Sequence, residues 1–191
     1  MNAGISNQSS SAIAIGSNAG AVSQQTQAMA IGTFAGETNQ KQNSAAIGVS
    51  AGQTSQGQSP TAIGSFAGQA GQGDNSTAIG TYAGSTSQKV SAIAIGANAA
   101  KISQGIQGTA IGFQAGENTQ GSGALAIGTV AGRTTQQPNA TAIGASAGST
   151  NQGTNAVAIG KSAGNDRQGS QAVAIGFESG RVQQSARALS I

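Results

Sequence analysis

The sequence predicts an all-β fold, a parallel β-solenoid (β-roll) of about twelve coils with 16 residues in each coil. Three observations predict it: a repeat of constant length, short segments that alternate like β-strands, and glycines at fixed positions between those segments. The repeat runs through residues 1–191, so we expect a single array. Ala3-Gly4 already matches Ala19-Gly20, and the chain stops on Ile191 within a repeat, as expected for a segment of a longer fibrous protein.

The string Ala-Ile-Gly marks the repeat and recurs every 16 residues without insertion or deletion. Its isoleucines, here called the isoleucine column, are Ile15, Ile31, Ile47, Ile63, Ile79, Ile95, Ile111, Ile127, Ile143, Ile159, Ile175 and Ile191. A glutamine follows nine residues after each isoleucine up to Ile175. These residues, here called the glutamine column, are Gln24, Gln40, Gln56, Gln72, Gln88, Gln104, Gln120, Gln136, Gln152, Gln168 and Gln184, and Gln8 extends the column toward the N-terminus. A disordered Gln/Ser/Gly linker also fits this composition, but a linker needs no constant register, whereas stacked coils do.

Each repeat is predicted to contain two short strands and two turns. Residues 12–15 (Ala-Ile-Ala-Ile) alternate as a strand does, and a second strand is predicted over 19–23 because its equivalents contain threonine. The glycines one and five residues after each isoleucine, such as Gly16 and Gly20, supply the bends at one side. Segments such as 152–155 (Gln-Gly-Thr-Asn) supply the opposite turn.

The glutamine column predicts a ladder of stacked side-chain amides at a turn, each bonded to the coils above and below. A turn residue that is merely solvated would vary among polar types, which favours the ladder.

The isoleucine column can face in either of two directions. The invariant Ala and Gly positions suit the interior of a narrow coil, which leaves isoleucine outside, where three chains would bury it along a common axis. The neighbouring column, two residues before each isoleucine, includes Ile13, Met29, Ala45 and Thr61, and a closed interior tolerates such a range of sizes poorly. The alternative keeps isoleucine inside each coil and permits a monomer.

The composition argues against catalysis. The chain has no Cys, His or Trp, its net charge is +3, and its five acids fall in different positions of different repeats: Glu37, Asp74, Glu117, Asp166 and Glu178. We therefore expect no enzyme, cofactor or metal site. Basic residues are too scattered for nucleic acid, and no segment is long and apolar enough for membrane insertion or resembles a signal peptide.

The few aromatic residues have two interpretations. Phe34, Phe66 and Tyr82 share the position three residues after isoleucine, while Phe113 and Phe177 lie one position earlier. The first three either form an exposed binding stripe or simply cover a glycine turn or a neighbouring subunit.

Around the Ala-Ile-Gly column, and best at 155–160 (Asn-Ala-Val-Ala-Ile-Gly), the sequence resembles the head repeats of trimeric autotransporter adhesins, the YadA-like family. Similar repeats occur in fibre-like proteins of phages and large viruses. The resemblance implies a left-handed, trimeric β-roll on a cell or virion surface that attaches to a host protein or glycan. The 16-residue unit and the fixed glutamine depart from the family's usual motif of about fourteen residues.

We therefore expect a structural, trimeric rod from a surface adhesin or a viral attachment fibre. Two alternatives remain. An ice-binding solenoid is suggested by the recurrence of Thr61, Thr77, Thr109 and Thr141 at one position, and a curli-like cross-β fibre is suggested by the Gln/Gly/Asn turns.

Overall fold

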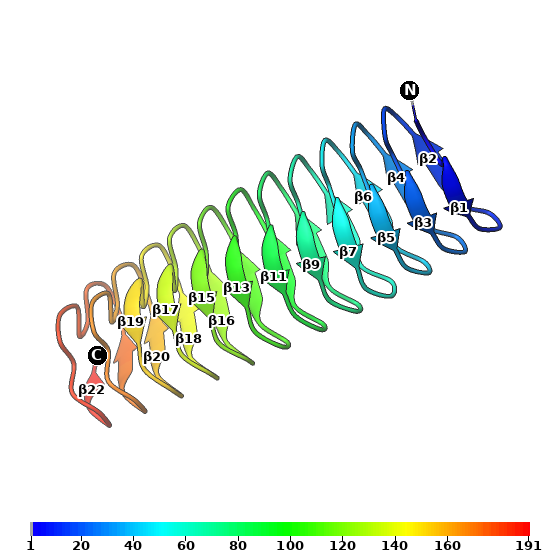
Figure 1. The fold of residues 1–191 in the computed structure, drawn as a ribbon. Helices are drawn as coiled ribbons and strands as arrows, with labels where there is room; N and C mark the ends of the chain where they lie inside the picture. The colour runs from blue at the N-terminus through cyan, green and yellow to red at the C-terminus, as the bar shows by residue number, and fades with distance from the viewer. Residues whose placement is uncertain (1) are drawn as a thin grey trace.

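The computed structural model describes residues 2–191, and these form an extended rod of stacked coils with the chain termini at opposite ends (Figure 1). Within this range the secondary structure consists of β-strands and no helices, and the strands pair only in parallel. The predicted parallel β-solenoid of about twelve 16-residue coils is confirmed. Met1, the first residue of the predicted array, lies outside the described residues.

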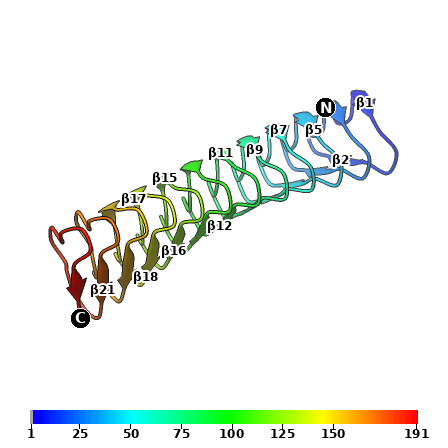
Figure 2. The ribbon, with the colours of Figure 1, turned by 90° about the horizontal axis from the view of Figure 1, so that it is seen from below.

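Each complete coil contributes to two sheets, which lie on opposite sides of the rod (Figure 2). The 10-stranded sheet, here called the glutamine sheet, consists of β1 (Ser6–Gln8), β3 (Val22–Gln24), β5 (Thr38–Gln40), β7 (Thr54–Gln56), β9 (Ala70–Gln72), β11 (Thr86–Gln88), β13 (Ile102–Gln104), β15 (Asn118–Gln120), β17 (Thr134–Gln136) and β19 (Thr150–Gln152). Beyond β19 it continues as isolated bridges, Thr150 to Asp166 and Asp166 to Val182.

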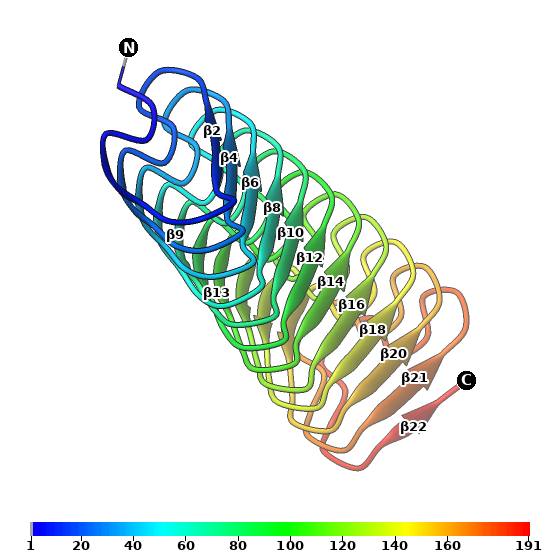
Figure 3. The ribbon, with the colours of Figure 1, turned by 90° about the vertical axis from the view of Figure 1, so that its right-hand side faces the viewer.

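The 12-stranded sheet, here called the isoleucine sheet, runs the whole length of the rod (Figure 3). Its strands are β2 (Ile13–Ile15), β4 (Met29–Ile31), β6 (Ala45–Ile47), β8 (Thr61–Ile63), β10 (Thr77–Ile79), β12 (Ile93–Ile95), β14 (Thr109–Ile111), β16 (Leu125–Ile127), β18 (Thr141–Ile143), β20 (Val157–Ile159), β21 (Val173–Ile175) and β22 (Leu189–Ser190).

The register between coils is constant. Ile95 pairs with Ile79 on one side and with Ile111 on the other, so identical positions stack directly above one another. With a spacing of about 4.8 Å between neighbouring strands, twelve coils make a rod of about 55 to 60 Å.

The glycine after each isoleucine is required by this stacking. Gly16 has φ +124°, and a Cβ on it would lie 2.7 Å from the carbonyl carbon of Gly32 in the next coil. Since the obstacle is backbone and not a movable side chain, any larger residue would push the two coils apart.

The two strands differ from the predicted ranges. The first begins at Ile13, one residue later than predicted. The predicted second strand over residues 19–23 is wrong in its first half, because Ala19 and Gly20 form a turn and the strand runs from Val22 to Gln24. Ala19 nevertheless faces the interior and is fully buried, which gives the turn the small-residue pattern of a strand.

Candidate functional site

The isoleucine sheet divides its side chains between the interior and the outer surface. In β12 the central residue Ala94 is fully buried, while Ile93 and Ile95 on either side of it are half-buried. The same pattern repeats along the sheet, so the alanine before each isoleucine faces inward. Isoleucine therefore lies outside the coil, as in the first of the two arrangements left open by the sequence, and the narrow interior explains this placement, because the buried apolar side chains there are alanines and Pro60.

The isoleucine column therefore lies on the outer surface for the length of the rod. Its members at the ends are the most exposed, with Ile15 at 59% and Ile191 at 89%. Between them Ile63, Ile111, Ile159 and Ile175 expose 36 to 40%, and the remaining members are half-buried: Ile31, Ile47, Ile79, Ile95, Ile127 and Ile143. Each isoleucine is covered from above and below by its neighbours in the column, but its outward face has no covering element within residues 2–191.

The glutamine column lies inside the coils and not at a turn, which corrects the predicted position of the ladder. Each glutamine from Gln24 to Gln152 is the last residue of its strand, and Gln168 and Gln184 occupy the equivalent position in the two following coils. All of them are at most 8% exposed. The interior thus consists of alanines and a single column of long polar side chains.

Gln120 shows how these amides are satisfied. Its Nε2 donates to the carbonyl of Thr109 in the opposite sheet at 2.8 Å, to the carbonyl of Ala124 at 3.3 Å and to Oε1 of Gln136 in the next coil at 3.1 Å. Its own Oε1 accepts from Nε2 of Gln104 at 3.0 Å. One side chain therefore links the two sheets within a coil and also links successive coils. From Gln88 to Gln184 this amide ladder is unbroken.

The ladder is interrupted in the coils of Gln40, Gln56 and Gln72. Gln40 donates only to the carbonyl of Met29, Gln72 only to that of Thr61, and Gln56 only to Oε1 of Gln72. Within residues 2–191 three buried glutamine oxygens, Oε1 of Gln40, Gln56 and Gln88, have no hydrogen-bond partner.

The interrupted coils share a difference four residues after the glutamine. Ser44, Pro60 and Ser76 stand where the other coils have alanine or glycine. In every coil with Ala or Gly at this position, the carbonyl of that residue accepts a bond from the glutamine, and in these three it does not. The residue four positions after the glutamine therefore correlates with whether the amide bonds to that residue's carbonyl.

The three aromatics of the predicted stripe form a ring pair and one separate ring. Phe66 and Tyr82, one coil apart, stack with ring centroids at 4.8 Å and an interplanar angle of 5°, and Lys101 Nζ lies 5.2 Å from the centre of the Tyr82 ring. Phe34 lies two coils from Phe66, with Ser50 between them. Phe34 and Phe66 are half-buried, so the exposed aromatic surface is small. Phe113 and Phe177, at the neighbouring position, are exposed to 49% and 70%.

Phe34, Phe66 and Tyr82 all have left-handed backbone, with φ between 57° and 59°. This conformation recurs at the same position of every complete coil, so the fold imposes it. The Phe66–Tyr82 stacking, worth about 0.5 to 1.5 kcal/mol in general, offsets part of its cost for bulky residues.

Charged residues form no repeated cluster within residues 2–191. The two ion pairs found there are Asp166 with Arg167 at 3.2 Å and Glu178 with Arg181 at 3.4 Å. In the same range no three His, Cys, Asp or Glu residues come together as metal ligands. No helix in the described part of the chain is long and apolar enough to cross a membrane.

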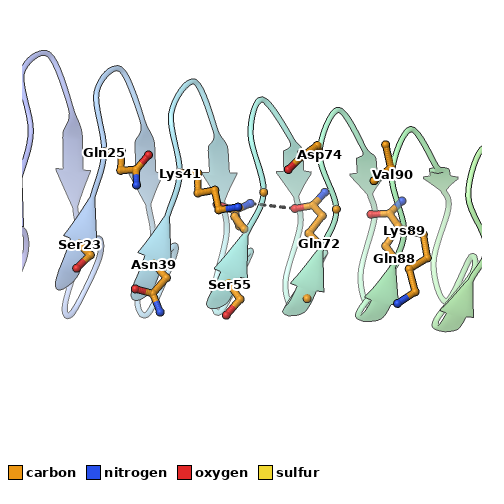
Figure 4. Close-up of a pocket in the computed structure, with 14 residues that line it drawn as sticks. Ser23, Gln25, Asn39, Lys41, Ser55, Gln72, Asp74, Gln88, Lys89 and Val90 are labelled. Carbon is orange, nitrogen blue, oxygen red and sulfur yellow. Dashed lines mark hydrogen bonds between the residues drawn. The ribbon is translucent and has the colours of Figure 1, made fainter.

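A cavity of about 590 Å³, which was not predicted from the sequence, follows the turns after the glutamine-sheet strands, from the coil of Ser23 to that of Val90 (Figure 4). A second cavity of about 490 Å³ adjoins it and shares Lys89. One signal was available: Gly57 and Gly73 lie between Lys41 and Lys89 in one column, so two consecutive side chains are absent there.

Comparisons with models of protein families, with curated proteins and with solved structures found no match for this chain.

Proposed function

We propose that this chain is a rigid, trimeric rod segment of a surface adhesin or viral attachment fibre, in which the isoleucine sheets of three copies meet along a common axis. The observation that carries the proposal is the outer face of the isoleucine sheet. The isoleucine column runs along it without interruption, beside a mixed column that includes Met29 and Leu125 but also four threonines. A continuous apolar surface of this length is typical of an interaction site.

A second copy of the chain is the partner that fits this face best. Its isoleucines repeat with the same axial spacing, so two copies in parallel register match at every coil, whereas a partner without this repeat would match at a few coils only. Closed rotational symmetry lets each copy bury the same face. Three copies are favoured over two by the resemblance of the Ala-Ile-Gly repeat to the heads of trimeric autotransporter adhesins.

The rod is suited to holding another part of a protein away from a surface. Parallel hydrogen bonds join every coil to the next, and the amide ladder adds side-chain bonds in the same direction. Extracellular display on a cell or virion and attachment to a host surface are part of the proposal through the same resemblance.

Light scattering coupled to size-exclusion chromatography tests the assembly. One chain has a mass of 18.2 kDa, so a trimer has 3 × 18.2 = 54.6 kDa. We expect the trimer mass at micromolar concentration, and a mass near 18 kDa that persists as the concentration is raised would contradict the proposal.

Ice binding is a second candidate because Thr61, Thr77, Thr109 and Thr141 lie on the outer face of the same sheet. Met29, Ile93 and Leu125 in the same column make this face uneven. Thermal hysteresis in a monomeric sample would favour ice binding, while concentration-dependent thioflavin fluorescence would favour a curli-like fibre.

A further inference from the structure

The cavity beside the glutamine sheet has the dimensions of a ligand site. Its volume of about 590 Å³ lies within the usual range for small-molecule sites, and it follows the rod axis past five coils (Figure 4). From the coil of Ser23 to that of Lys89 there are four coil spacings, or about 19 Å. A ligand that fills the length of this cavity must therefore be extended.

The floor of this groove is open because side chains are absent where neighbouring coils have them. Gly57 and Gly73 occupy the column of Lys41 and Lys89. A Cβ on Gly73 would lie 2.6 Å from the carbonyl carbon of Lys89, so close packing of backbone requires glycine there. Gly71 differs, because a Cβ on it would meet no atom closer than 3.9 Å.

Charged groups stand along the same groove. Lys41 and Lys89 are exposed, belong to neither of the ion pairs found in the described residues, and lie three coils apart, about 14 Å. Between them lies Asp74, whose Oδ1 accepts a bond from the backbone N–H of Gln58 at 2.8 Å. The lining thus combines two separated cations, one fixed acceptor and the polar side chains of Ser23, Asn39 and Ser55.

Two other extended ligands fit this lining less well. A peptide bound by strand addition needs an unpaired strand edge, and the strands beside the groove are paired on both sides. A single-stranded nucleic acid needs aromatic platforms for its bases and a positive charge for most phosphates, and the groove has no aromatic lining residue and only two lysines.

We propose that this groove binds an extended acidic oligosaccharide. Its carboxylate or sulfate groups pair with Lys41 and Lys89, and its hydroxyls form hydrogen bonds with Asp74, Asn39 and Ser55. The inference deepens the attachment role proposed above and rests on it for the source of the ligand, a glycan at a host surface.

Calorimetric titration of the purified chain with an oligogalacturonate of about six sugars tests this proposal, with an uncharged cello-oligosaccharide of equal length as the comparison ligand. We expect saturable binding of the acidic ligand and binding at least tenfold weaker for the uncharged one. Absence of binding, or equal binding of both ligands, would overturn the proposal.

Matched variants separate the groove from general charge attraction. Gly71→Gln fills the groove at a position where Gln183 already occupies the same column with φ 48°, and Thr135→Gln makes the same change outside the first cavity. We expect affinity to fall at least tenfold for Gly71→Gln and to stay unchanged for Thr135→Gln, with both melting temperatures near that of the parent. The double change Lys41→Gln and Lys89→Gln should likewise reduce affinity far more than Lys101→Gln with Lys161→Gln.

Equal losses within either pair of variants would identify nonspecific attraction and overturn the site. The mass of each sample, measured in parallel, keeps the two proposals distinct. A trimer that does not bind the oligosaccharide would support the trimeric rod and overturn the oligosaccharide site. A monomer that binds the oligosaccharide would support the site and overturn the trimeric rod.

Discussion

The isoleucine sheet and the glutamine sheet have the same coil spacing and enclose the same interior, but they present different surfaces to solvent. Each isoleucine-sheet strand except β22 turns one alanine inward and two residues outward, of which the last is isoleucine. Each glutamine-sheet strand turns its glutamine inward, and its outward positions are mostly Thr, Ser and Asn. The isoleucine sheet therefore has small apolar side chains inside and large apolar ones outside, whereas the glutamine sheet has long polar side chains inside and mostly short polar ones outside.

This difference shows how one narrow coil combines a hydrogen-bonded interior with an apolar outer face. The glutamine sheet directs its longest side chains into the interior, where their amides join the sheets and the coils. The isoleucine sheet directs its largest apolar side chains away from an interior that has no room for them. The apolar burial that a larger fold obtains inside its own core is, on our account, obtained here between chains.

The largest effect is expected from a charge on the outer face of the isoleucine sheet, with the same change on the glutamine sheet as the control. Ile95→Asp places three carboxylates together near the axis of the proposed trimer, where each buried charge costs several kcal/mol, so the assembly should dissociate at neutral pH. Ile102→Asp makes the same change on the glutamine sheet, where Ile102 is 44% exposed, and should leave the mass unchanged.

The pH dependence of Ile95→Asp follows from the same burial. Burial and mutual repulsion raise the pKa of the introduced carboxyls above the ordinary value of about 3.9. Association should therefore be retained below that value and lost as the pH rises through the elevated pKa. Light scattering between pH 3 and pH 7 measures this, and equal behaviour of the two variants would remove the distinction between the faces.

The turns at the ends of the two sheets should also differ in tolerance. Gly112 follows the isoleucine sheet, and a Cβ on it would lie 2.7 Å from the carbonyl oxygen of Gly128 in the next coil. Gly116 precedes the glutamine sheet, and a Cβ there would meet the flexible side chain of Gln120 at 3.1 Å.

We therefore expect Gly112→Ala to destabilise by about 4 kcal/mol or more, and Gly116→Ala by about 1 to 2 kcal/mol through its left-handed backbone alone. Thermal unfolding followed by circular dichroism gives both values. Similar losses for the two variants would show that the backbone contact between coils is softer than the structure indicates.

Within the glutamine sheet, the continuous and interrupted parts of the ladder should respond differently to the loss of a glutamine. Gln120 donates to three acceptors and accepts one bond, whereas Gln56 makes a single bond. Gln120→Ala should cost about 3 kcal/mol and Gln56→Ala about 1 kcal/mol. Chemical denaturation measures both, and an equal cost would mean that burial of the side chain, and not the ladder, determines its contribution.

The smallest effect is a gain. Ala100 is the one residue other than glycine at its turn position between Gly20 and Gly180, with φ 44°. Ala100→Gly relieves left-handed strain, and after the greater chain entropy lost by glycine we expect a net stabilisation of about 0.5 kcal/mol. An unchanged or lower melting temperature would show that burial of the Ala100 methyl group outweighs the strain.

Much of the fold followed from the sequence because the repeat constrains every coil equally. The twelve isoleucines predict the coil length and register, and the invariance of the alanine columns indicates a narrow interior. The strand predicted over 19–23 was misplaced because Ala19, a turn residue, also packs inside the coil. A small residue therefore recurs at this position in every repeat, as it would at an inward-facing position of a strand.

Other features depend on distances that a sequence pattern does not contain. A buried glutamine and a glutamine at a turn look alike until the carbonyls of residues such as Thr109 and Ala124 are placed around the amide. Whether an amide also bonds to the carbonyl four residues later varies with single residues such as Pro60, and the groove depends on how closely Gly73 approaches the next coil.

Cysteine cross-linking tests most directly the claim that the isoleucine sheets of several copies meet in register. The parent has no cysteine, so Thr109→Cys on the outer face of the isoleucine sheet and Thr134→Cys on that of the glutamine sheet introduce single thiols at two half-buried threonines. A short bifunctional thiol reagent should join chains of Thr109→Cys into covalent dimers on a denaturing gel and leave Thr134→Cys monomeric. Dimers from Thr134→Cys alone, or equal yields from both variants, would contradict the assignment of the isoleucine sheet as the interface.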